Sequence, residues 1–100
     1  MQWFICHIQN ILDSHLYFVV KESNIYLITF GDKLRMHRVS QDISQQQLAY
    51  ETGLSREYIN RIENGKVNIS LINVIALANV LQIKVTLLLD FDTKTTWLPK

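Results

Sequence analysis

A short stretch of the chain carries polar side chains of the types that suit the edges of DNA bases: Arg56, Glu57, Asn60 and Arg61. Arginine can bond guanine at two points, asparagine can do the same with adenine, and glutamate can accept a hydrogen bond from cytosine. Ile59 and Ile62 are three positions apart, which places both on one side of a helix. We therefore expect a helix from Ser55 to Asn64 with its polar side chains facing outward.

A second short helix is expected immediately before it. Ser44 suits an N-cap, and Gln47 stands three residues later, the spacing of a capping box. Leu48 and Ala49 are expected to face inward, and Gly53 is expected to end this helix. Two short helices joined by a glycine-containing turn form a helix-turn-helix, in which the second helix is thin enough to enter the major groove.

Three further helices are expected around this pair. The first, over residues 30–39, would place Phe30, Leu34 and Val39 near one face. Ser70 is a good cap for LINVIALANVL, in which the side chains expected to face the core are Leu71, Ile75, Ala78 and Leu81. The segment VTLLLDF, residues 85–91, predicts a fifth short helix. These elements predict an all-α domain over residues 30–90.

The residues before this domain follow a different pattern. Apolar side chains at helical spacing are compatible with a short helix over residues 2–13. The runs LYFVV and IYLITF flank the polar segment KESN and resemble a β-hairpin. We therefore expect an extension over residues 1–29, the domain over 30–90, and a C-terminal tail over 91–100.

Composition limits the number of domains and the classes of protein to which the chain can belong. The chain has 100 residues with 48% hydrophobic and 19% charged side chains, which predicts one globular domain. No apolar run reaches the roughly 18 residues that span a membrane, and the N-terminal segment lacks the features of a secretory signal. The single cysteine, Cys6, fits a reducing cytoplasm. Cys6, His7 and His15 lack a fourth ligand at a familiar spacing, so we expect no metal and no cofactor.

The motifs FGDKLRMHR, SQQQLAYETGLSREYINRIENGK and NISLINVIALANVL resemble the phage repressor and Cro family of helix-turn-helix domains, often called Xre-like. Within it, AYETGLSREYINRIENGKVNISL is most similar to controller proteins of restriction–modification systems. The resemblance implies a five-helix, phage-repressor-like DNA-binding domain. Double-stranded DNA would then be the partner, and no small-molecule ligand is evident.

The resemblance also implies residue roles. The base contacts would come from Arg56, Glu57, Asn60 and Arg61. Phosphate contacts would come from Gln45, which would also brace the recognition helix, and from Ser55, Asn64 and Lys66. Arg38 and Glu63 match a pair that links the first helix to the end of the recognition helix.

The function expected from these features is a sequence-specific transcriptional regulator, acting as a homodimer on a palindromic operator. The leucine run Leu87, Leu88 and Leu89 exceeds what one small core can use, which predicts dimerisation through the fifth helix. The alternative is an antitoxin-like or adaptor protein whose N-terminal extension binds another protein. An enzyme is not expected, because no acid, base and nucleophile converge and no phosphate-binding loop is present.

Overall fold

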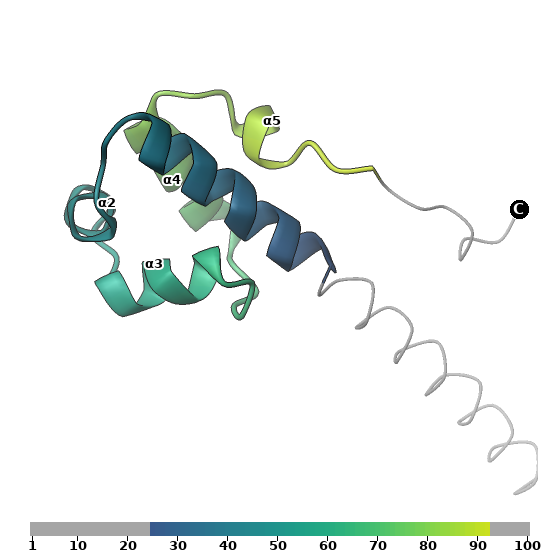
Figure 1. Ribbon diagram of the computed structural model, residues 1–100, viewed down its shortest axis with the longest axis horizontal. Coiled ribbons are helices and arrows are strands. Elements are labelled where there is room, and N and C mark those ends of the chain that lie inside the picture. Colours follow the sequence, from purple (N-terminus) through teal and green to yellow (C-terminus); the bar gives the residue numbers. More distant parts are fainter. Residues whose placement is uncertain (1–24, 93–100) are drawn as a thin grey trace, which may run out of the picture.

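The computed structural model describes residues 25–92, which form five helices without a strand in that range. The first helix covers residues 25–40 and is followed by α2 (Gln45–Thr52), α3 (Arg56–Glu63), α4 (Leu71–Leu81) and α5 (Val85–Leu88). In Figure 1, α3 lies below the first helix, and the short helix α5 lies above it, between α4 and the C-terminal end of the described chain. The expected all-α architecture is confirmed.

Residues 25–30, expected as the second strand of a hairpin, are helical instead. Phe30 and Leu34, one helical turn apart, are both buried in the core. Burial of this face outweighs the β preference of the segment IYLITF, because local propensity yields to tertiary packing. The first helix therefore continues across residues 29 and 30. The other expected elements of the extension, the helix over 2–13 and the run LYFVV, lie outside the described residues.

Gly31 allows the first helix to approach the end of α3 closely. A Cβ at this position would lie 2.5 Å from the carbonyl oxygen of Ile62 and 2.6 Å from that of Glu63. A side chain therefore does not fit without a shift of the backbone. This close approach brings the first helix within reach of the polar groups at the end of α3.

All five helices contribute to one apolar core. α2 supplies Leu48 and Ala49, and α3 supplies Ile59 and Ile62, as expected. The expected inward face of α4 is partly wrong, because Leu71 is 64% and Ile75 is 40% exposed. Val39 of the first helix is likewise exposed. The remaining core side chains are Phe30, Leu34, Val74, Leu77, Ala78, Leu81 and Leu88.

Serine side chains begin three of the helices. The Oγ atoms of Ser44, Ser55 and Ser70 accept hydrogen bonds from backbone N–H groups three residues later. The capping box at Ser44 is only half formed: Gln47 N donates to Ser44 Oγ, but the Gln47 side chain bonds Glu51, at 2.8 Å, and not the backbone N–H of Ser44. These caps set the starting points of the two helices that carry the polar surface.

Candidate nucleic-acid interface

The turn between α2 and α3 fixes the angle at which α3 leaves the domain. Gly53 ends α2 with φ of 75°, a left-handed conformation that glycine adopts without steric cost. Leu54 then packs against the core, and Ser55 caps α3. α3 is anchored on its inward side by Ile59 and Ile62, both essentially inaccessible to solvent. Its opposite side is consequently left open to solvent.

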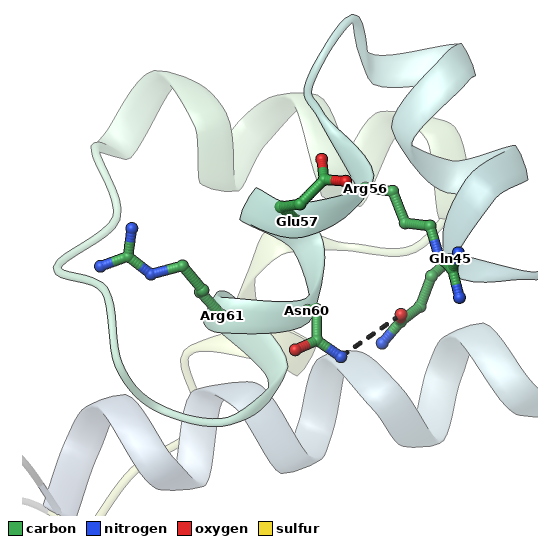
Figure 2. A pocket seen from close by; sticks show the side chains of 5 residues that line it. All are labelled: Gln45, Arg56, Glu57, Asn60 and Arg61. Carbon is green, nitrogen blue, oxygen red and sulfur yellow. Dashed lines mark hydrogen bonds between the residues drawn. The ribbon is translucent and has the colours of Figure 1, made fainter.

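The four side chains expected at DNA bases occupy that open side. They line one hollow together with Gln45 of α2. Figure 2 shows Arg56 extending toward Gln45, while Arg61 points to the opposite side of α3. The set of exposed side chains thus combines two cations, one anion and one amide: Arg56, Arg61, Glu57 and Asn60. This arrangement offers donors and acceptors to a ligand that reaches along α3.

Arg38 and Glu63 form the ion pair that joins the first helix to the end of α3. Arg38 Nε lies 2.7 Å from Glu63 Oε2, and its Nη2 lies 3.0 Å from Oε1. Arg38 Nη1 also donates to the carbonyl oxygen of Ile43 at 2.8 Å. The Glu63 side chain is 2% exposed, so the carboxylate depends on these donors for the hydrogen bonds that water would otherwise make.

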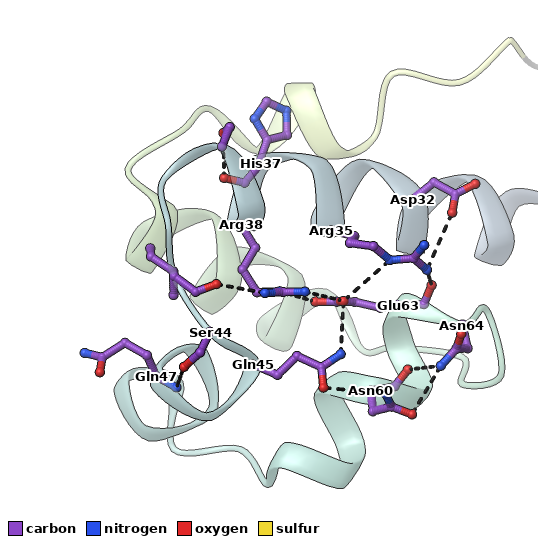
Figure 3. A network of polar contacts seen from close by, with 12 residues as sticks. Asp32, Arg35, His37, Arg38, Ser44, Gln45, Gln47, Asn60, Glu63 and Asn64 are labelled. Atoms are coloured by element: carbon purple, nitrogen blue, oxygen red, sulfur yellow. Dashed lines mark hydrogen bonds and ion pairs between the residues drawn. The ribbon is translucent and has the colours of Figure 1, made fainter.

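Glu63 also orients Gln45, the residue expected to contact phosphate and brace α3. Gln45 Nε2 donates to Glu63 Oε1 at 3.1 Å, and its Oε1 faces Asn60 Nδ2 at 3.5 Å (Figure 3). Asn64 Nδ2 in turn donates to the carbonyl oxygen of Asn60 at 2.8 Å and to its Oδ1 at 3.2 Å. A continuous chain of polar contacts therefore connects the buried ion pair to the exposed side of α3.

One member of this network was not expected from the sequence. Arg35 Nη2 donates to the carbonyl oxygen of Glu63 at 2.7 Å, which satisfies a backbone acceptor in the last turn of α3. Its Nε lies 3.7 Å from Glu63 Oε1. The signal was available in the spacing, because Arg35 stands three residues before Arg38 and both lie on the side of the first helix that meets α3.

The remaining expected phosphate contacts lie at the two ends of α3. Ser55 Oγ accepts a hydrogen bond from Tyr58 N at 3.1 Å, which leaves its hydroxyl hydrogen available to a ligand. Lys66 is exposed just beyond α3, and its backbone N–H donates to the carbonyl oxygen of Arg61 at 3.0 Å. Asn64 is exposed too, although its amide is already used in capping α3.

The leucines at positions 87–89, in α5 and directly after it, do not form a single surface. Leu88 is fully buried in the core, which corrects the expectation that it faces a partner subunit. Leu87 and Leu89 are 46% and 39% exposed. α4, which packs against α5, exposes three further large apolar side chains, Leu71, Ile72 and Ile75. Of these, Leu71 and Ile75 were expected to face the core.

Among residues 25–92, no group of three or more His, Cys, Asp and Glu side chains is arranged to hold a metal ion. In that range, too, no helix has the length and apolar character required to cross a membrane.

Comparison with known proteins identifies the class of this surface. A family model described as helix-turn-helix matches residues 34–88, more than half of the chain. The chain therefore belongs to the Xre-like helix-turn-helix family, and it is a DNA-binding transcriptional regulator.

Two relatives and one solved structure are named as control or controller proteins. The control protein C.BamHI of Bacillus amyloliquefaciens is 43% identical over 72 residues, which cover 71% of this chain and 88% of that protein. The control protein C.MunI of Mycoplasma sp is 44% identical over 48 residues, which cover 47% of this chain and 65% of that protein. The crystal structure of the restriction–modification controller protein C.AhdI from Aeromonas hydrophila is 40% identical, with a TM-score of 0.61, and the match covers 62% of this chain and 94% of that one.

Proposed function

We propose that this regulator controls restriction–modification genes by binding a palindromic operator as a homodimer. The observation that carries the proposal is the open side of α3, where four polar side chains stand free of the core while the buried Glu63 network holds the helix in place. The similarity to controller proteins supplies the biological context. Such a protein acts in the cytoplasm and carries out no catalysis.

In this proposal α3 enters the major groove and reads bases directly. Arg56 and Arg61 would donate to guanine, Glu57 would accept from cytosine, and Asn60 would pair with adenine. Asn60 is held by Gln45 and Asn64, so little side-chain freedom is lost when it binds. Arg56 and Arg61 extend to different sides of α3, which suits contacts to different base pairs.

Phosphate contacts would fix the position of α3 in the groove. Gln45 stands at the first residue of α2, where unpaired backbone N–H groups favour an anion. Lys66 stands beyond the opposite end of α3, where a cation can meet the sugar–phosphate backbone. These contacts set orientation and affinity without selecting a sequence.

Dimerisation would come from the exposed apolar side chains of α4 and α5. Leu87 on α5, Leu89 directly after it, and Leu71 and Ile72 on α4 leave apolar area in water that a symmetric copy can cover. Two copies would then present their α3 helices to half-sites about 34–36 Å apart, one turn of DNA.

The test is selection of duplexes from a random pool by the full chain, followed by binding measurements on the selected duplex and on a scrambled one at several salt concentrations. The proposal predicts an inverted repeat with half-sites about one helical turn apart, and stronger binding to it than to scrambled DNA. Equal affinity for both duplexes at every salt concentration would contradict sequence-specific binding. A methyltransferase or endonuclease gene beside the coding sequence would support the restriction–modification context, and its absence would count against it.

A further inference from the structure

Tyr50 is a conspicuously exposed aromatic side chain of the domain. Its side chain is 82% exposed, more than any other large apolar or aromatic residue among residues 25–92. In the same range no hydrogen-bond partner exists for its hydroxyl. A ring and a hydroxyl that the fold does not use are available to a ligand.

The position of Tyr50 relates it to the recognition helix. It lies on α2 one turn after Gln46 and lines a hollow with Gly53, Ser55 and Arg56. Arg56 and Glu57 line this hollow and also the one that contains Gln45 and Asn60. The two hollows therefore meet at the N-terminal end of α3, with Gln45 at one and Tyr50 at the other.

The turn leaves space in front of Tyr50. A Cβ built on Gly53 meets nothing within 4 Å, so this part of the hollow is open to a large ligand. Gln46, Ser55 and Tyr50 together supply an amide, a hydroxyl and a phenol, all of which donate hydrogen bonds. The hollow is also lined by the cation Arg56 and the carboxylate of Glu57, whose formal charges cancel. The three neutral donors can therefore bond an anion such as a phosphate of a DNA strand.

We propose that Tyr50 is a further DNA contact, whose hydroxyl donates to a backbone phosphate on the strand opposite the one held by Gln45. This inference rests on the proposed function, in which the N-terminal end of α3 enters the major groove. The groove is about 12 Å wide and is bounded by one backbone on each side. Tyrosine is among the side chains that commonly bond DNA phosphates, and its ring can pack against the adjoining sugar.

The test compares three variants with the wild-type chain on the duplex that the wild type selects. Tyr50→Phe removes only the hydroxyl, and Tyr50→Ala removes the ring as well. Tyr26→Phe is the matched control, because Tyr26 packs against Phe91 in a hollow that shares no residue with the two at α3. Unchanged melting temperatures of the Tyr50 variants are expected, since the side chain is exposed.

Tyr50→Phe should bind about tenfold more weakly, the cost of losing one hydrogen bond to a charged group. The loss should be equal at every salt concentration, because a neutral hydroxyl releases no counterion from DNA. Tyr50→Ala should bind more weakly still, and Tyr26→Phe should match the wild type. Duplexes with a single neutral methylphosphonate linkage should include one that weakens the wild type but leaves Tyr50→Phe unchanged.

Two negative results would distinguish failure of the Tyr50 contact from failure of the proposed function. If the wild type selects an operator and Tyr50→Phe binds it equally well, the hydroxyl contact is wrong while the proposed function stands. The exposed Tyr50 side chain would then contact another protein or take no part in binding. If the wild type selects no duplex at all, the proposed function fails and the Tyr50 contact fails with it.

Discussion

Gln45 and Glu63 share a hydrogen bond of 3.1 Å that joins the first residue of α2 to the last residue of α3. The same carboxylate is held by Arg38 through two further hydrogen bonds. The buried ion pair therefore does more than stabilise the fold. Its carboxylate also fixes the position of the Gln45 side chain, which the proposed function places at a DNA phosphate. Stability and DNA binding are coupled through this one carboxylate.

The buried ion pair should contribute strongly to stability. Arg38→Ala or Glu63→Ala should each lower the free energy of unfolding by about 3–5 kcal/mol, because a charge is left in the interior without its partner. Urea denaturation monitored by circular dichroism would measure the change. Asp32→Ala is the control: its contact with Arg35 is 3.8 Å long and both side chains are well exposed, so the loss should stay below about 1 kcal/mol. Unchanged stability in both variants of the buried pair would contradict this account.

Arg61 and Lys66 should affect DNA binding in different ways. Arg61→Ala should cost about 1–3 kcal/mol on the operator and relax the preference at particular base pairs. Lys66→Ala should weaken binding to all sequences alike and reduce the salt dependence by about one unit of slope. Binding curves on operator and scrambled duplexes would separate the two effects. Equal affinities of Arg61→Ala and the wild type on both duplexes would show that α3 does not read bases.

Substitutions at the neighbouring residues Leu88, in α5, and Leu89, directly after it, should affect folding and dimerisation differently. Leu88→Ala should lower the free energy of unfolding by about 2–5 kcal/mol, because Leu88 is fully buried. Leu89→Glu should weaken the dimer with little loss of helical structure, because Leu89 is 39% exposed. Sedimentation equilibrium together with circular dichroism distinguishes these results. A wild-type chain that remains monomeric at micromolar concentrations, with one half-site occupied per molecule, would argue against the dimer.

Two glycines should respond differently to substitution. Gly31→Ala should destabilise the domain by about 1–3 kcal/mol, because the added Cβ meets backbone atoms of Ile62 and Glu63. Gly53→Ala should cost about 1–2 kcal/mol for a different reason, the positive φ of 75°. Gly53→Asn should recover part of that loss, since asparagine tolerates this conformation, whereas Gly31→Asn should not. Thermal unfolding of the four variants would measure these losses of stability. Equal recovery by asparagine at both positions would contradict the assignment of different causes to the two glycines.

Local signals predicted α2, α3 and their caps well. Ser44 and Ser55 stand directly before helices whose buried positions, such as Ile59 and Ile62, alternate with polar ones. In such helices the pattern leaves only one side that can face the core. The outward placement of Arg56 and Arg61 follows from the same pattern.

Other features depend on tertiary contacts that no local pattern contains. Nearly every position of α4 is apolar, so periodicity did not distinguish the buried Val74 and Leu77 from the exposed Leu71. Residues 25–30 have strand-forming side chains, but a helix buries Phe30 in the core. The bond between Gln45 and Glu63 joins residues far apart in the chain, and its geometry required the folded structure.

The outward side chains of α3 differ in whether they form hydrogen bonds with other residues of the protein. Among residues 25–92, Arg56, Glu57 and Arg61 make no side-chain hydrogen bond or ion pair, whereas Asn60 is bonded to Gln45 and Asn64. Substitutions at the three positions without such contacts should therefore have little effect on folding. Such positions can diverge freely between related regulators, so that a new operator preference evolves on an unchanged scaffold while Asn60 remains constrained by its neighbours.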